Sequence, residues 1–262
     1  MSASTQSAAA EGPGGYAGPL LLATACVAGL TLTWVLAALV PITHVKDAIA
    51  LYDFTRLNRP AIEVPARLLL DLLEPAFFIV WGIALVAIAL SHGRRRVGLA
   101  VALVLSLAPA SAELLKPLLA HPHAEVVPLY IKGASWPSGH ATAATALFWC
   151  VLLVARPNRR RALALVGVVL LAAVGCSLLI LAWHMPSDVI GGYLLGTLWF
   201  ALALLGLRAS RRGTAAQPLP SPGAPACSPG AHSNSELAGL GAAGSSFAAR
   251  LRMNSMSDSR FK

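Results

Sequence analysis

The chain has 262 residues, of which 56% are hydrophobic and only 12% are charged, and its mean hydropathy is +0.69. This composition excludes an ordinary soluble domain and leaves enough length for several membrane spans. The formal net charge of +9 comes from short arginine clusters between apolar runs rather than from one basic face, so a nucleic-acid partner is not expected.

Six apolar runs follow a small, polar N-terminal segment. Residues 1–18 are dominated by Gly, Ser and Ala and are predicted to be disordered. Each run approximates the ~20 residues that cross a bilayer core, the fourth being the shortest. The runs are Leu20–Val40, Leu72–Ser91, Val97–Leu115, Ala141–Ala155, Ala162–Trp183 and Val189–Leu207. We therefore predict an all-α, polytopic membrane helix bundle with about six transmembrane helices over residues 19–208.

Every second connection between these runs is rich in arginine. The clusters lie in residues 94–96, 156–161 and 208–212. The positive-inside rule predicts that these connections and both termini are cytoplasmic and that the other three connections, beginning with a loop over residues 42–67, face outward. The Pro-, Gly-, Ala- and Ser-rich residues 209–262 are predicted to be a disordered cytoplasmic tail. The alanine- and arginine-rich composition favours a bacterial plasma membrane.

The predicted outer connections contain the side chains that are candidates for catalysis and phosphate binding. One holds Lys116, followed by His121-Pro122-His123 and then by the segment Trp136-Pro-Ser-Gly-His140. Another holds the segment Trp183-His-Met-Pro-Ser-Asp188. The topology places all of them on one membrane face, although the motifs were identified without using the topology. This convergence predicts a functional site.

Ser138 and Gly139 stand where the fourth run begins. The N-terminus of a helix presents unpaired N–H groups and the positive end of its dipole, and Ser is a favoured N-cap. A phosphate group is bound well there, with glycine allowing close approach of the backbone. The alternative is that Pro-Ser-Gly simply starts a helix.

His184 and Asp188 are one helical turn apart. That spacing places a carboxylate against one imidazole nitrogen and leaves the other nitrogen directed at a substrate, as in the second pair of a catalytic triad. The alternative is an interfacial histidine beside an aspartate that starts a helix.

The order and spacing of these motifs over about residues 70–207 resemble the three-part signature of the type 2 phosphatidic acid phosphatase (PAP2) superfamily. The resemblance implies that His184 is a nucleophile forming a phosphohistidine and that Asp188 orients it. It also implies that His140 is the acid that protonates the leaving group and later activates water. The phosphate oxygens would be held by Lys116, Ser138 and Gly139, with His123 at the position of a family arginine.

Two positions depart from the family pattern. The first family motif ends in Arg-Pro where this chain has His123-Ala124, and the third opens with Ser-Arg where it has Ser177-Leu178. Losing two arginine–phosphate contacts without replacement would cost several kcal/mol at about 1.5–3 kcal/mol each. Candidate replacements are His123, His121, Arg56, Arg59, Arg67 and Lys132. Because histidine titrates near neutral pH, a role for His123 predicts activity that favours mildly acidic conditions.

The sequence therefore predicts a membrane phosphatase that hydrolyses a lipid phosphate or isoprenyl diphosphate on the extracytoplasmic side. No cofactor and no metal site is predicted, and the oligomeric state is not indicated. Two alternatives remain: a phosphotransferase using the same residues, and a catalytically silent membrane protein that binds a phosphorylated lipid.

The sequence also predicts the surroundings of a few other residues near the outer face. Glu113 is three residues before Lys116 and is expected to pair with it. Asp71 and Glu74 are expected at the interface. Trp136 and Trp183 are expected in an aromatic belt.

Overall fold

The computed structural model describes residues 14–119 and 136–215, and every regular element in these ranges is helical. The α-helices are α1 (Gly14–Leu39), α2 (Pro41–Thr55), α3 (Pro60–Asp71), α4 (Pro75–Ser91), α5 (Arg95–Leu119), α6 (Gly139–Val154), α7 (Arg160–Ile180) and α8 (Pro186–Ala215), with a short 3₁₀ helix over Pro157–Arg159. The predictions of disorder for residues 1–18 and 209–262 are wrong where these residues are described, because residues 14–18 begin α1 and residues 209–215 end α8. The rest of both segments, residues 1–13 and 216–262, lies outside the described residues.

Four of these helices, α1, α5, α7 and α8, are long and apolar enough to cross a membrane. A fifth crossing is formed by α3 and α4 if the pair, bent by 53°, counts as one span. The apolar helix α6 has 16 residues, which is about 24 Å at 1.5 Å per residue and shorter than a bilayer core. The predicted all-α membrane bundle of about six transmembrane helices is confirmed.

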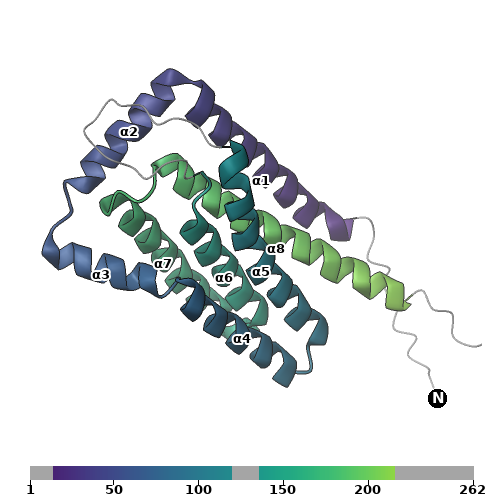
Figure 1. Ribbon diagram of the computed structural model, residues 1–262. Coiled ribbons are helices and arrows are strands. Elements are labelled where there is room, and N and C mark those ends of the chain that lie inside the picture. The colour runs from purple at the N-terminus through teal and green to yellow at the C-terminus, as the bar shows by residue number, and fades with distance from the viewer. Residues whose placement is uncertain (1–13, 120–135, 216–262) are drawn as a thin grey trace, which may run out of the picture. The chain divides into compact units, whose positions relative to one another are not determined.

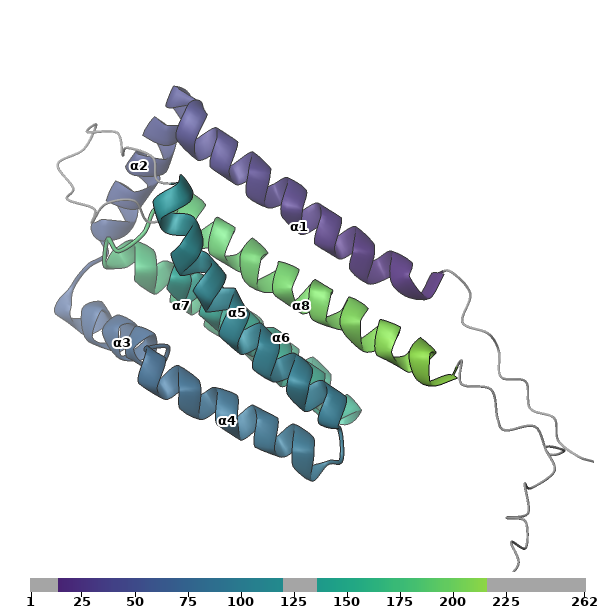
Figure 2. The same cartoon turned by 45° about the vertical axis from the view of Figure 1, so that its right-hand side comes forward.

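α6 is the central helix of the bundle. It packs against α4, α5, α7 and α8, and α1 lies along the outer side of α8 (Figures 1 and 2). Large apolar side chains on the periphery remain exposed, among them Leu118 at 75% and Leu165 at 72%. Because lipid tails are as apolar as leucine, these surfaces suit a hydrocarbon environment.

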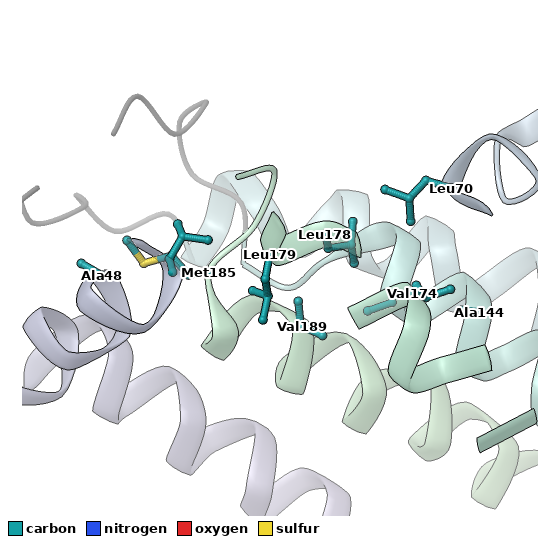
Figure 3. Close-up of a cluster of buried hydrophobic side chains, with 10 residues drawn as sticks. Ala48, Leu70, Ala144, Val174, Leu178, Leu179, Met185 and Val189 are labelled. Carbon is teal, nitrogen blue, oxygen red and sulfur yellow. The ribbon is translucent and has the colours of Figure 1, made fainter. Parts of the chain in front are cut away.

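The predicted outer loop over residues 42–67 is instead largely helical, in α2 and α3. Pro41 and Pro60 each occupy the first helical turn, where the missing proline N–H costs no hydrogen bond. Each helix buries one narrow apolar face, with Leu51 and Leu70 both fully buried. Figure 3 shows the apolar cluster that they join, which fixes both helices beside the starts of α6 and α8.

Candidate active site

Ser138 caps α6, and its backbone is joined to α8. Its hydroxyl accepts a long hydrogen bond of 3.4 Å from the Ala141 N–H, as an N-cap residue does. Its own N–H donates to the carbonyl of Asp188 at 3.0 Å, and the side chain is fully buried. The prediction that the Ser138 N–H is a free donor is therefore wrong. Among the described residues, the N–H groups of Gly139 and His140 form no hydrogen bond and are the donors that α6 offers.

His184 and Asp188 meet at the start of α8. His184 Nδ1 lies 3.5 Å from Asp188 Oδ2, which is longer than a typical hydrogen bond, and both side chains are buried. The same oxygen accepts a hydrogen bond of 2.9 Å from the Met185 N–H. Asp188 thus satisfies the helix terminus, as an acidic residue in a capping box does, and also faces the imidazole. The geometry of the pair is therefore compatible with both interpretations.

Lys116 reaches this region from the end of α5. Its Nζ is 2.6 Å from Glu113 Oε1, so the predicted pair is confirmed. A Cβ placed on Gly139 would lie 2.9 Å from that oxygen and 3.7 Å from Nζ. The absence of a side chain at Gly139 therefore lets the Glu113 carboxylate, with its Lys116 partner, approach the start of α6.

A cavity of about 860 Å³ connects these groups. Its polar wall contains His140, His184 and the Lys116–Glu113 pair with Gly139, whereas Ser138 and Asp188 lie buried behind it. The rings of His140 and Trp183 are 5.6 Å apart between centroids. The rest of the wall is largely apolar and comes from α4 and α5, including Phe78, Ile79, Leu105 and Pro109. The cavity therefore has a polar end, with two imidazoles and a lysine–glutamate pair, and an apolar flank.

The approach of α6 to α8 depends on two glycines that the sequence analysis did not single out. A Cβ on Gly192 would lie 2.6 Å from the Ser138 carbonyl oxygen, and one on Gly196 would lie 2.8 Å from the Thr142 carbonyl oxygen. The spacing is Gly-x-x-x-Gly, a known signal for close packing of membrane helices. Searching for that signal would have identified this contact.

Asp47 on α2 is a second residue that the sequence analysis missed. Its carboxylate accepts hydrogen bonds from the Ser187 hydroxyl at 2.6 Å and from the Ser187 N–H at 3.2 Å. Burial raises the pKa of Asp47, with a smaller contribution from the charge of Asp188, and the two Ser187 bonds oppose that increase only in part. α2 is not among the membrane spans. This contact ties α2 to the turn that carries His184, and no local sequence signal marked it.

The candidate replacements for the family arginines do not enter the cavity where they are described. Leu178 is fully buried in the apolar cluster (Figure 3), so its position offers no cation. Arg56 and Arg59 are exposed outside the cavity, and Arg67 pairs with Glu63 at 2.9 Å. The remaining candidates, His121, His123 and Lys132, lie outside the described residues. Lys116 is the one lysine or arginine of the described chain that lines the cavity.

Trp136 departs from its predicted place in an interfacial belt. It is only 3% exposed, and a Cβ on Gly191 would lie 2.6 Å from its Nε1. Trp136 thus packs on α8, just before α6 begins. Within residues 14–119 and 136–215, no group of three or more His, Cys, Asp or Glu side chains is placed to hold a metal ion.

Comparison with known proteins agrees with the motifs and with the fold. Residues 97–212 match the model of the PAP2 superfamily. The crystal structure described as the first transmembrane PAP2 type phosphatidylglycerolphosphate phosphatase from Bacillus subtilis resembles this chain with a TM-score of 0.57 at 19% identity, covering 73% of this chain and 96% of that one. No curated protein sequence matches the chain. The matched region, which contains Lys116 and both histidine motifs, thus confirms the resemblance of this chain to the PAP2 superfamily.

Proposed function

We propose that this protein is a membrane phosphatase that hydrolyses a lipid phosphate or an isoprenyl diphosphate through a phosphohistidine on His184. The observation that carries the proposal is the shared cavity, in which two imidazoles and an ammonium group face an apolar wall. The family match supports a membrane phosphatase at a coarser level.

The first chemical step uses the imidazole nitrogen that Asp188 does not face. His184 Nε2 attacks phosphorus, the N–P bond forms, and the bond to the ester or anhydride oxygen breaks. His140, as the imidazolium, gives its proton to that leaving oxygen. Asp188 holds the Nδ1 proton and stabilises the positive charge that develops on His184.

The second step returns the enzyme to its starting state. His140, now neutral, accepts a proton from water as the water oxygen attacks phosphorus. The N–P bond breaks, which restores His184 and releases inorganic phosphate. Lys116 and the N–H groups of Gly139 and His140 would stabilise the charge on the phosphoryl oxygens in both steps. An alcohol in place of water would give phosphotransfer with the same residues.

The apolar flank of the cavity supports an amphiphilic substrate. Phe78 and Ile79 belong to the first two turns of α4, beside the exposed apolar surface of that helix. A lipid tail could stay among these side chains while its phosphate reaches His184. A small soluble phosphate ester would leave that wall uncovered, so long-chain substrates are expected to be preferred.

Phosphate release by the purified protein tests the proposal. The substrates are an isoprenyl diphosphate, phosphatidic acid and phosphatidylglycerol phosphate, the last chosen because the structurally similar protein is described as acting on it. We expect release by the wild type and its loss in His184→Ala. His92→Ala is the matched control, because His92 is an exposed histidine at the end of α4. Equal rates for the wild type and His184→Ala would exclude His184 as the nucleophile.

One observation favours the silent lipid-binding alternative. The position of a family arginine is filled by Leu178, which is buried in an apolar cluster with no described cation to replace it. Binding of a labelled phosphorylated lipid without phosphate release from any of the three substrates would support that alternative.

A further inference from the structure

A second polar cavity, of about 600 Å³, lies at the opposite ends of the helices that form the candidate active site. It is bounded by the α4–α5 turn, the end of α6, the start of α7 and the last part of α8. Along α5 this cavity is separated from Lys116 by about 30 Å, at 1.5 Å per residue. Its polar wall contains five arginines: Arg94, Arg95, Arg96, Arg160 and Arg208.

Three of the five guanidinium groups are fixed in place by backbone carbonyls. Arg94 donates to Leu153 O at 3.0 Å and to Val154 O at 3.2 Å, at the end of α6. Arg96 donates to Ser210 O at 3.0 Å, and Arg160 donates to Ala155 O at 3.3 Å. A guanidinium has five N–H donors, so these bonds orient Arg94 and Arg160 without exhausting their donors.

The cavity has no described carboxylate to balance this charge. All the described Asp and Glu residues lie on α2, on α3, at the α3–α4 turn, at the end of α5 or at the start of α8. These residues are Asp47, Asp53, Glu63, Asp71, Glu74, Glu113 and Asp188. Within the described chain, Arg94, Arg95, Arg160 and Arg208 make no ion pair. The concentration of positive charge without a described carboxylate therefore favours binding of an anion.

The remaining wall of the cavity shows which kind of anion fits. It is formed by Val97 of α5, Leu153 of α6, and Leu204 and Leu207 of α8. Planar guanidinium groups match phosphate geometry, and basic pockets between membrane helices suit anionic head groups. We propose that this cavity binds the phosphate head group of an anionic membrane phospholipid, with an acyl chain against the leucines.

Lipid binding by the purified, delipidated protein tests this proposal. Native mass spectrometry follows phosphatidylglycerol and phosphatidylcholine binding to the wild type and to the double variant Arg95→Gln/Arg208→Gln. These two residues line the cavity but form no hydrogen bond with a backbone carbonyl of the described chain, so replacing them keeps the bonds that Arg94, Arg96 and Arg160 make to the helix ends. The matched control is Arg156→Gln/Arg159→Gln, which removes the same charge from two exposed arginines at the same end of the bundle but outside the cavity.

We expect phosphatidylglycerol to bind at least about tenfold more weakly to the cavity variant, because two charge-assisted contacts are lost. The control variant should differ from the wild type by less than about twofold, since Arg156 and Arg159 lie outside the cavity and contribute only a screened surface charge. In a Lys116→Ala background the effect of the cavity variant should persist, which separates this cavity from the candidate active site. Phosphate release is a separate readout, so failure of this proposal and failure of the proposed function are distinguishable.

Three outcomes would overturn the proposal. The first is an equal loss of phosphatidylglycerol binding in the cavity and control variants. The second is equal affinity of the wild type for phosphatidylcholine and phosphatidylglycerol. The third is displacement of phosphatidylglycerol by glycerol 3-phosphate at equal concentration, which would mean that a free phosphate is the ligand.

Discussion

The backbone N–H of Ser138 donates a hydrogen bond to the carbonyl oxygen of Asp188 at 3.0 Å, joining the start of α6 to the first turn of α8. His140 follows on α6, and His184 precedes the first turn of α8. The relative position of the two imidazoles therefore depends on this backbone contact and on the glycines that allow the two helices to approach.

Gly192→Ala should lower both stability and activity. Its new methyl group would meet the Ser138 carbonyl oxygen at 2.6 Å, and such overpacking costs about 1–3 kcal/mol. Thermal unfolding in detergent and phosphate release measure the two effects. Gly206→Ala on the same helix is the control, because its Cβ would meet no atom within 4 Å. Similar losses from both substitutions would show that close packing at Gly192 is unimportant.

Asp188→Asn should abolish most activity while the fold is kept. The amide oxygen can still accept from the Met185 N–H, but the negative charge that holds the His184 tautomer is lost. A decrease in kcat on the order of 10³-fold is expected. The exposed Asp53→Asn change is the control. Retention of more than about a tenth of the wild-type kcat would argue against the orienting role.

Lys116→Gln should reduce kcat/KM on the order of 10- to 100-fold, because a charged contact to a phosphoryl oxygen is removed. Glu113→Gln should raise kcat/KM or lower it less than Lys116→Gln does, since it removes only the carboxylate that lies 2.6 Å from the Lys116 ammonium. Lys46→Gln, on the exposed side of α2, serves as the control. Unchanged kinetics in Lys116→Gln would remove Lys116 from the site.

The raised pKa of Asp47 predicts a pH-dependent stability difference. The folded state holds the Asp47 proton more tightly than the unfolded chain, so the group stabilises the fold at low pH. That contribution is lost as pH rises from about 4 through the raised value. Thermal unfolding across this range should show the wild type losing stability relative to Asp47→Asn. Parallel curves for the two proteins would contradict the prediction.

The membrane bundle and most of the site could be predicted from the sequence because both leave local signals. Apolar runs mark the spans, and the His184–Asp188 spacing marks one helical turn. The Asp47–Ser187 contact and the burial of Ser138 could not be predicted, because they depend on how distant helices pack. The same holds for Leu178, whose burial requires α2 and α3 to fold over the site rather than form a loop.

His123 stays a sequence-based prediction, because it lies outside the described residues. If this histidine replaces a family arginine, its positive charge is partial at neutral pH and activity should fall as pH rises toward 8. His123→Arg should flatten that limb of the pH profile of kcat/KM. An identical profile in the variant would exclude His123 from the phosphate contacts.

Trapping of the phosphoenzyme tests the central claim most directly. The purified protein would be mixed with a substrate labelled with ³²P in its terminal phosphate and quenched within one turnover. We expect an acid-labile, base-stable label on the peptide that contains Trp183 and His184, and no label in His184→Ala. Phosphate release without a labelled intermediate, or a label on another residue, would contradict it.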